Sequence, residues 1–576
     1  MKSRFLLFLI IGTFNSIVSA QTLNWGVYLN TQNVLSASDV AVDNLGNTYT
    51  IGFYVNNNDF NPGSGVFTLA ELNNDVGNVF CVKLNPNGNF VWAIPVGGRN
   101  NFDALLFAGG QPKIAIDNNN GAIYISCAYD APVDFDPSPA TFLLPTDSGN
   151  TDVFVAKYTT AGAFVWAKNL GVVTYEEIDV DSSGNVYLAG NFPYTTDIDP
   201  GPNVFNLTTN PGGDDFYILK LNPNGEFVWA KQFGDPTRYD FLTDIVIDDA
   251  DNIVITGLFS GLVDFDPNAG VTNLQSNNNS NDAFVAKYTS NGELIWAKSF
   301  GGTSSGIERG SAVTVDNQNN VYATGYFSSV TDFDPSANTF NLSTVGTRSL
   351  YILKLTSNGE FDFVKTVGSP FTEFSTDIAV DNVGSLYLTG YYLTSMDCNP
   401  DAGVFTITAN GGNNEIFLIS LSASNGQFGW AKSIGETAND EGKRIAIHEP
   451  TNRLTLVGHF QGGSSVDFDA PNGFYLPNAP NSGSGTYIIN YSYNSLSNID
   501  FINEDKIIIY PNPANDEITI QSNQDIENYQ LIDLTGKVIL SQSNSNSINV
   551  SSINPGMYLL KILSNNSITT KKVIIK

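Results

Sequence analysis

The chain has 576 residues, of which 14% are charged, and its 57 acidic and 26 basic residues give a formal net charge of −31. An electrostatic field of this sign repels nucleic acids and anionic membranes, which excludes both as partners. The three cysteines (Cys81, Cys127 and Cys398) are too few for a disulfide framework.

Residues 1–20 have the pattern of a secretory signal peptide. Lys2 and Arg4 give a positive start, residues 5–11 form a short apolar run, and Val18-Ser19-Ala20 supplies small residues before a cleavage point. This run is too short to span a bilayer, although a retained anchor is the alternative. No later segment is apolar enough to cross a membrane. We therefore expect a mature, soluble, exported protein that begins at Gln21.

Residues 21–494 contain an internal repeat. Each unit has four short apolar strands without helical periodicity, as at 244–248, 253–259, 283–288 and 293–298, which predicts one antiparallel sheet per unit. All six tryptophans occupy one position of the fourth strand, and Phe363 stands at the seventh place. The tryptophans are Trp25, Trp92, Trp166, Trp229, Trp296 and Trp430.

The tryptophan strands are displaced relative to the other strands. The first and third strands each recur seven times, whereas the tryptophan series begins at Trp25, before the first full unit, and stops before the last. Pairing of residues 24–29 with 486–491 would close a ring and remove both open edges. The sequence thus predicts an all-β chain with a seven-bladed β-propeller closed by an N-terminal strand. A linear solenoid is the alternative.

The tryptophans are interpreted as packing residues between neighbouring blades, with exposed carbohydrate-binding tryptophans as the alternative. The recurring pattern Asp-x-x-Gly-Asn-x-Tyr-x-x-Gly, as at 181–190, and the Trp-Ala-Lys strand resemble the bacterial SBBP repeats. The resemblance covers about residues 21–494, and blade seven departs from it at 448–452. It implies a propeller but no particular activity.

The connections predict two different faces of the ring. The short first-to-second and third-to-fourth turns share one face, which we call the short-turn face, and the longer connections share the opposite, long-loop face. Because functional residues concentrate on loops, we expect a site on the long-loop face. Aromatic residues and arginines in four fourth-to-first connections are suited to binding, but ordinary surface loops would look the same. These segments are 99–103, 238–240, 308–309 and 371–374.

An acidic motif, Asp-x-Asp-Pro or a close variant, recurs in every second-to-third connection. In an extended segment its two carboxylates lie on one side and the middle residue on the other. Oxygen ligands of this kind suit Ca²⁺, whereas local turn formation is the alternative interpretation. The carboxylates considered as metal ligands are Asp134, Asp136, Asp197, Asp199, Asp264, Asp266, Asp332, Asp334, Asp467 and Asp469.

Nucleophilic catalysis has little support in the sequence, and no catalytic residue is predicted. The two histidines, His448 and His459, both lie in the last unit and are interpreted as structural, and no Cys/His metal spacing is present. A glycosidase needs only two suitably spaced carboxylates, so a hydrolase or lyase remains an alternative.

After a linker at 495–504, residues 505–576 contain seven short strands, which predict a small immunoglobulin-like β-sandwich. The motifs at 510–514, 534–538, 555–561 and 571–576 resemble the type A C-terminal sorting domain of the type IX secretion system. The resemblance implies that the secretion machinery is a partner of residues 505–576. It also implies that the protein is secreted or lies on the outer-membrane surface of a Gram-negative bacterium.

Three functions are consistent with a location outside the cell or on its surface. The first is a surface or secreted binding module for an unidentified extracellular protein or glycan, with calcium as its candidate cofactor. The second is an extracellular polysaccharide hydrolase or lyase that uses loop carboxylates. The third is a structural surface protein without a small ligand.

Overall fold

The computed structural model divides the chain into two compact units, Met1–Ser495 and Leu496–Lys576. The structure describes residues 21–29, 35–69, 77–99, 110–130, 132–146, 151–209, 213–235, 238–277, 280–302, 306–371, 373–409, 413–435, 438–461, 468, 484–493, 508–510, 512–521, 526–533, 537–543, 545, 547–564 and 567–576. The predicted signal peptide and linker lie outside these residues.

The fold is all-β, as predicted. The main strands of the larger unit repeat one arrangement, four antiparallel strands in a sheet. In one sheet the fourth strand also pairs, through Gly301 and Gly302, with the short hairpin of Thr331–Asp332 and Asn341–Leu342. The sheets are β2 (Leu35–Val42), β3 (Thr48–Tyr54), β6 (Gly77–Leu84) and β7 (Phe90–Arg99); β8 (Lys113–Asp117), β9 (Ala122–Tyr129), β10 (Asp152–Thr159) and β11 (Phe164–Asn169); β12 (Thr174–Val180), β13 (Val186–Phe192), β16 (Asp215–Leu221) and β17 (Phe227–Phe233); β18 (Phe241–Ile247), β19 (Ile253–Ser260), β22 (Asn281–Tyr288) and β23 (Leu294–Gly302); β24 (Arg309–Val315), β25 (Val321–Phe327), β28 (Ser349–Leu355) and β29 (Phe361–Val367); β30 (Glu373–Val380), β31 (Ser385–Leu393), β34 (Asn414–Ser422) and β35 (Phe428–Ile434); and β36 (Glu441–His448), β37 (Arg453–Gln461), β38 (Ser484–Tyr493) and β1 (Gln21–Leu29).

Short hairpins between the second and third strands carry the acidic motif. They are β4 (Asn58–Asp59) with β5 (Thr68–Leu69), β14 (Thr196–Asp197) with β15 (Asn206–Leu207), β20 (Leu262–Asp264) with β21 (Asn273–Gln275), β26 (Thr331–Asp332) with β27 (Asn341–Leu342), and β32 (Ser395–Asp397) with β33 (Thr406–Thr408). A 3-10 turn, η2 (Glu449–Thr451), joins β36 to β37.

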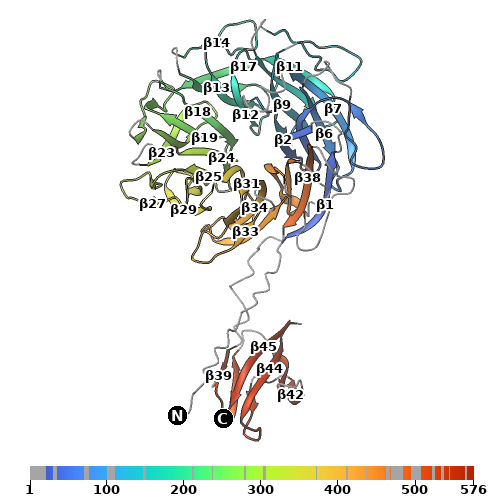
Figure 1. The fold of residues 1–576 in the computed structure, drawn as a ribbon, viewed down its shortest axis with the longest axis vertical. Coiled ribbons are helices and arrows are strands. Elements are labelled where there is room, and N and C mark those ends of the chain that lie inside the picture. Colours follow the sequence, from blue (N-terminus) through green and yellow to red (C-terminus); the bar gives the residue numbers. More distant parts are fainter. Residues whose placement is uncertain are drawn as a thin grey trace. The chain divides into compact units, whose positions relative to one another are not determined.

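The first strands of the sheets lie together at the centre of the larger unit (Figure 1). Strands β2, β8, β12, β18, β24, β30 and β36 contact one another in this order, and β36 also contacts β2. Each of these strands is therefore an edge strand of its own sheet and a neighbour of the next sheet.

Strand β1 pairs with β38, which lies at the far end of the repeat. Trp25 is opposite Asn490 and Leu29 is opposite Thr486, so the pairing predicted from the displaced tryptophan series is present. The indole Nε1 of Trp25 also donates a hydrogen bond to the Pro86 carbonyl at 3.0 Å, which links β1 to the β2 sheet.

Five of the six tryptophans, Trp25, Trp92, Trp166, Trp229 and Trp296, pack against a glycine of the third-to-fourth turn of the following sheet. A Cβ atom added to Gly88, whose φ is +76°, would lie 2.7 Å from the Trp25 ring, so the contact requires glycine. The same contact joins Gly359 to Trp296, and Gly426 to Phe363 at the seventh place. Since the rings fill the space between sheets, their interpretation as packing residues is supported.

The smaller unit consists of two antiparallel sheets. One contains β39 (Ile508–Tyr510), β40 (Glu517–Gln521) and β43 (Ser547–Asn549), and the other contains β42 (Val538–Ser543), β41 (Ile526–Ile532), β44 (Gly556–Ser564) and β45 (Ser567–Ile575). Ile518 and Ile520 of the first sheet share a core with Leu531, Leu560 and Val573 of the second. The seven strands expected from the sequence are all present. Within the described residues, no helix is long and apolar enough to cross a membrane.

Deletion of residues 21–29 should lower the melting temperature of the larger unit. The deletion removes the outer strand of the β36 sheet and leaves β38 with an unpaired edge. Thermal unfolding followed by circular dichroism measures the effect. Equal melting temperatures for the parent and the truncated protein would contradict a closing role for β1.

Candidate functional site

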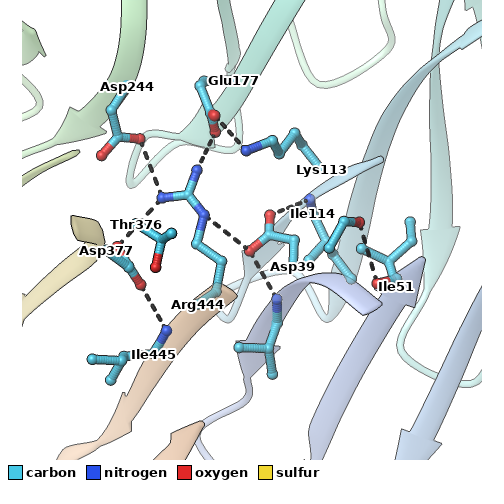
Figure 2. Close-up of polar contacts among 12 residues, drawn as sticks. Asp39, Ile51, Lys113, Ile114, Glu177, Asp244, Thr376, Asp377, Arg444 and Ile445 are labelled. Atoms are coloured by element: carbon cyan, nitrogen blue, oxygen red, sulfur yellow. Dashed lines mark hydrogen bonds and ion pairs between the residues drawn. The ribbon is translucent and has the colours of Figure 1, made fainter. Parts of the chain in front are cut away.

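A set of charged side chains lies where the first strands meet at the centre of the larger unit (Figure 2). Each residue directly precedes the recurring buried isoleucine or valine of its strand, so the set occupies one repeat position. Four members are acidic, two are basic and one is alanine. We call this set the central ring: Asp39, Lys113, Glu177, Asp244, Ala312, Asp377 and Arg444.

Arg444 is the centre of this ring. Its guanidinium nitrogens lie 2.8 Å from Glu177 Oε2, 3.3 Å from Asp377 Oδ1, 3.7 Å from Asp244 Oδ1 and 3.8 Å from Asp39 Oδ1. The arginine on β36 thus contacts carboxylates from four other sheets, while its side chain is only 13% exposed. Lys113 forms a second ion pair with Glu177.

The aspartates of the ring also hydrogen-bond to the backbone of the following sheet. Asp39 Oδ2 accepts from Ile114 N at 3.0 Å, Asp244 Oδ2 from Val313 N at 2.8 Å, and Asp377 Oδ2 from Ile445 N at 2.6 Å. These donors belong to inner edge strands, where a backbone N–H can lack a strand partner. Each aspartate therefore satisfies an edge donor and connects two sheets.

Burial changes the protonation of these carboxyl groups. It raises the pKa of Asp244 to about 8 and that of Asp377 to about 6, while Arg444 opposes both shifts. Burial also raises the pKa of Asp39, again against the effect of Arg444. Because the guanidinium donors already face protein carboxylates, the ring is suited to holding sheets together.

The central ring was not predicted from the sequence. A sequence signal for it exists, because each ring residue directly precedes an aligned apolar residue of a first strand. These apolar residues are Val40, Ile114, Ile178, Ile245, Val313, Ile378 and Ile445. That position varies between acid, base and alanine, so a search for a recurring residue type passes over it.

On the short-turn face, the Asp-x-x-Gly-Asn-x-Tyr pattern forms a local hydrogen-bond network. Asp181 Oδ1 accepts from Ser183 N and Asn185 N, and its Oδ2 accepts from the Tyr187 hydroxyl at 3.0 Å. Lys220 Nζ lies 3.5 Å from the same Oδ2. Asp43 and Asp316 form the corresponding bonds to Tyr49 and Tyr322. The pattern therefore stabilises turns.

A cavity of about 340 Å³ lies beside these turns, on the face opposite to the one predicted for a site. Its lining includes Asp117, Asp181, Asp248, Asp249 and Asp251. Asp117, Asp181 and Asp248 already accept hydrogen bonds within their own turns. The structure thus assigns these three carboxylates a local structural role.

The Asp-x-Asp-Pro loops have the geometry of turns. Asp134 Oδ1 accepts from Asp136 N at 3.1 Å and from Phe142 N at 2.8 Å, and Asp136 Oδ1 accepts from Ser138 N at 2.9 Å. The same bonds recur at Asp197 and Asp199, at Asp264 and Asp266, and at Asp332 and Asp334. The middle residues are buried, as expected: Phe135, Ile198, Phe265 and Phe333.

These contacts favour turn formation over metal binding. One oxygen of each carboxylate is occupied by backbone N–H donors, and the described residues contain no group of three or more histidine, cysteine, aspartate or glutamate side chains placed to hold a metal. Asp467 and Asp469 lie outside the described residues. Calcium binding by the Asp-x-Asp-Pro loops stays a prediction.

The predicted fourth-to-first connections differ in what they expose. Tyr239 and Phe371 are exposed, whereas Asp240, Glu308 and Glu373 are buried. Burial raises the pKa of Asp240 and that of Glu373 to about 7. Asp240 accepts backbone hydrogen bonds from Asp235 and Ser260, so it supports its own loop. Of segment 99–103, the side chain of Arg99 and residues 100–103 lie outside the described residues.

Both histidines have structural surroundings. His448 Nδ1 lies 2.6 Å from the Thr451 hydroxyl, and its Nε2 lies 3.2 Å from the Asn44 carbonyl of the neighbouring β2 sheet. Burial and the nearby Lys443 lower the pKa of His459 to about 4, so this imidazole is neutral at physiological pH.

Residues 508–576 match the family model described as the secretion system C-terminal sorting domain. This domain implies export through the type IX system to the cell surface or beyond it. An uncharacterized WD repeat-containing protein of Acanthamoeba polyphaga mimivirus is 23% identical over 439 residues, which are 64% of this chain and 31% of that protein. The chain thus spans about a third of this curated relative.

Similar solved structures include a protein of unknown function from Dyadobacter fermentans, with 11% identity and a TM-score of 0.35 over 69% of this chain and 97% of that one. A second is the quinohemoprotein alcohol dehydrogenase from Comamonas testosteroni, with 12% identity and a TM-score of 0.34 over 82% of this chain and 77% of that one. At these scores neither similarity carries a functional argument.

Replacement of Arg444 by methionine should destabilise the larger unit by about 3–5 kcal/mol at pH 8, because it leaves buried carboxylates without their cation. Urea unfolding measures the loss. The control Lys365→Met removes a cation whose partner, Asp401, is 38% exposed, and should cost about 1 kcal/mol or less. Equal effects of the two substitutions would refute the central role of Arg444.

The loss of unfolding free energy caused by Arg444→Met should be smaller at pH 5 than at pH 8, because the Asp244 carboxyl is protonated at pH 5 and then needs no cation. Burial raises the pKa of folded Asp244 from 3.8 to about 8, so in this range the folded protein binds a proton that the unfolded chain releases. The contribution of Asp244 to stability is therefore present at low pH and is lost as the pH rises from about 4 to about 8. A loss that is constant between pH 5 and pH 8 would contradict this linkage.

Replacement of Asp264 by alanine should destabilise the protein by about 1–3 kcal/mol, because two backbone donors lose their acceptor. If the carboxylate acts only in the turn, the loss is the same in calcium and in chelator. Differential scanning fluorimetry under both conditions measures it. A calcium-dependent rise in the melting temperature of the parent, absent from the variant, would instead establish a cation site.

Proposed function

We propose that this chain is an exported binding module, in which a seven-bladed β-propeller presents its long-loop face to an extracellular partner. The observation that carries the proposal is the sorting domain at residues 508–576, joined to a repeat unit with variable loops. The predicted signal peptide at residues 1–20 would begin the same export route.

The propeller architecture is supported by three features of the larger unit. Its sheets share one strand order, their first strands contact one another in sequence, and β36 contacts β2. The pairing of β1 with β38 supplies the outer strand of the last sheet from the N-terminal end of the repeat. In this interpretation each sheet is one blade, and the resemblance to SBBP repeats agrees with it.

The carboxyl groups favour binding over hydrolysis. Asp240, Glu373 and Asp282, whose pKa values burial raises to about 7, are all buried. Asp282 accepts a hydrogen bond from Asn277 N, as Asp240 does from Ser260 N. A general acid has to reach its substrate, so these groups are better placed to hold loops than to cleave glycosidic bonds.

The two faces of the propeller have different roles in this proposal. The short-turn face repeats the same hydrogen-bonded turn from sheet to sheet, as at Asp43, Asp181 and Asp316. The long-loop face carries exposed aromatic residues that differ between sheets, among them Tyr239 and Phe371. Rigid sheets that position variable loops are suited to specific recognition.

Removal of residues 508–576 should prevent the protein from reaching the cell surface in a bacterium that has a type IX secretion system. The parent should be accessible to protease added to intact cells, whereas the truncated protein should be retained in the periplasm, where the protease does not reach it. Cell fractionation with immunoblotting measures both. As a control, Arg238→Gln in the full chain should be exported like the parent. Equal surface exposure of the truncated protein would refute the proposed route.

A further inference from the structure

On the long-loop face, an aromatic cluster lies at the junction of the β24 and β30 sheets. Tyr326 at the end of β25 contacts Phe374 of β30 edge to face, with ring centroids 6.0 Å apart. Phe374 in turn contacts Tyr391 of β31 at 5.1 Å. Phe374 and Tyr391 are half-buried, so each residue is partly accessible to solvent. Strands β24 and β30 begin at segments 308–309 and 371–374, whose sequences are suited to binding but would also fit ordinary surface loops.

The guanidinium of Arg348 lies over two aromatic rings of this cluster. Its guanidinium carbon lies 4.5 Å from the ring centroid of Tyr326 and 5.6 Å from that of Phe374. Contact with two aromatic rings restricts the guanidinium, and its N–H groups are the donors that a ligand would meet. Burial raises the pKa of Tyr391 to about 12, an effect that Glu441 increases and Arg348 opposes.

A second arginine shares the same side of the sheet. Arg309 of β24 is directly opposite Tyr326 of β25, and residues paired in this way project from the same face. Within the described part of the chain, no carboxylate lies within 4.0 Å of a guanidinium nitrogen of Arg309 or Arg348. The absence of a partner is unusual here, because acidic residues outnumber basic ones by 57 to 26.

From this arrangement we propose that the cluster of Arg309, Tyr326, Arg348, Phe374 and Tyr391 binds a carboxylate-bearing sugar, a uronic acid residue of an extracellular polysaccharide. The inference rests on the proposed binding function and names its ligand class. The exposed parts of the Phe374 and Tyr391 rings contact the apolar C–H face of the pyranose. The edge of the Arg348 guanidinium donates two parallel hydrogen bonds to the sugar carboxylate, and Arg309 adds a second positive charge.

The net charge of −31 does not prevent this contact. At physiological ionic strength, charges separated by more than about 8 Å are largely screened, so the nearest groups dominate the field at the site. The two arginines are such groups. Glu441, the acidic residue that acts on Tyr391, is itself paired with Lys443 at 2.6 Å. A neutral sugar would use the aromatic rings but leave the guanidinium edge without an acceptor.

The test is calorimetric titration of the full chain with tetragalacturonate. The parent should bind it, and Arg348→Gln should weaken binding by about tenfold or more, the effect of losing a charge-assisted hydrogen bond. Phe374→Ala should also weaken binding. Arg348→Lys should bind with intermediate affinity, because it keeps the charge but loses the planar fork. The control Lys298→Gln removes a cation from strand β23, outside the loops proposed for binding, and should bind like the parent.

Two further probes decide the ligand class. Carboxyl-reduced tetragalacturonate, which is neutral, should bind at least about tenfold more weakly than the acid. Poly-glutamate should not compete with tetragalacturonate, since it has carboxylates but no pyranose face. Equal binding of the neutral sugar, or full competition by poly-glutamate, would overturn the proposed ligand.

The outcomes also separate this inference from the proposed function. If tetragalacturonate binds the parent and Arg348→Gln equally well, the site assignment is wrong and the binding module stands. If the parent does not bind tetragalacturonate, the ligand assignment is wrong. The proposed binding function would fall only if the surface-exposed parent also bound no component of an extracellular matrix extract. Melting temperatures of the parent and Arg348→Gln within about 2 °C of each other would show that lost affinity is not lost folding.

Discussion

The inner edge of each sheet is the constraint on which the larger unit depends. A four-stranded antiparallel sheet has two edge strands with unpaired backbone groups, and here one of them lies at the centre, beside the first strands of the neighbouring sheets. The aspartates of the central ring accept backbone hydrogen bonds from the next sheet, which brings their carboxylates close together. Arg444 neutralises this negative charge. The ionic cluster and the strand contacts at the centre are thus two parts of one arrangement.

Repeated residues and non-repeated residues have different roles in this molecule. Repeated residues build the scaffold. Five of the tryptophans pack on turn glycines, the first aspartate of the Asp-x-x-Gly-Asn-x-Tyr pattern accepts a hydrogen bond from a tyrosine hydroxyl, and the Asp-x-Asp-Pro aspartates accept hydrogen bonds from their own loops. Arg348 and Phe374 do not belong to any of these repeated patterns. Repetition in the sequence therefore indicated structure, while the surface proposed for binding consists of residues that depart from the repetition.

Much of the fold could be predicted from the sequence because period and alternation are local properties. The strand ranges, the pairing of β1 with β38 and the strands of the smaller unit all follow from them. The central ring could not be predicted in this way, since the partners of Arg444 come from separate strands far apart in the chain. The arginine–aromatic cluster could be predicted only in part. Segments 308–309 and 371–374 were named from the sequence as suited to binding, but Tyr326, Arg348 and Tyr391 come from other connections and strands.

The pairing of β1 with β38 has a consequence for the order of folding. It joins residues as far apart as Asn24 and Asn490, 466 positions along the chain, so the first strand to emerge finds its partner only when nearly the whole repeat is available. The intermediate sheets form from local hairpins and need no such wait. Strand β1 is therefore expected to stay unpaired until β38, the last described strand of the larger unit, has been made.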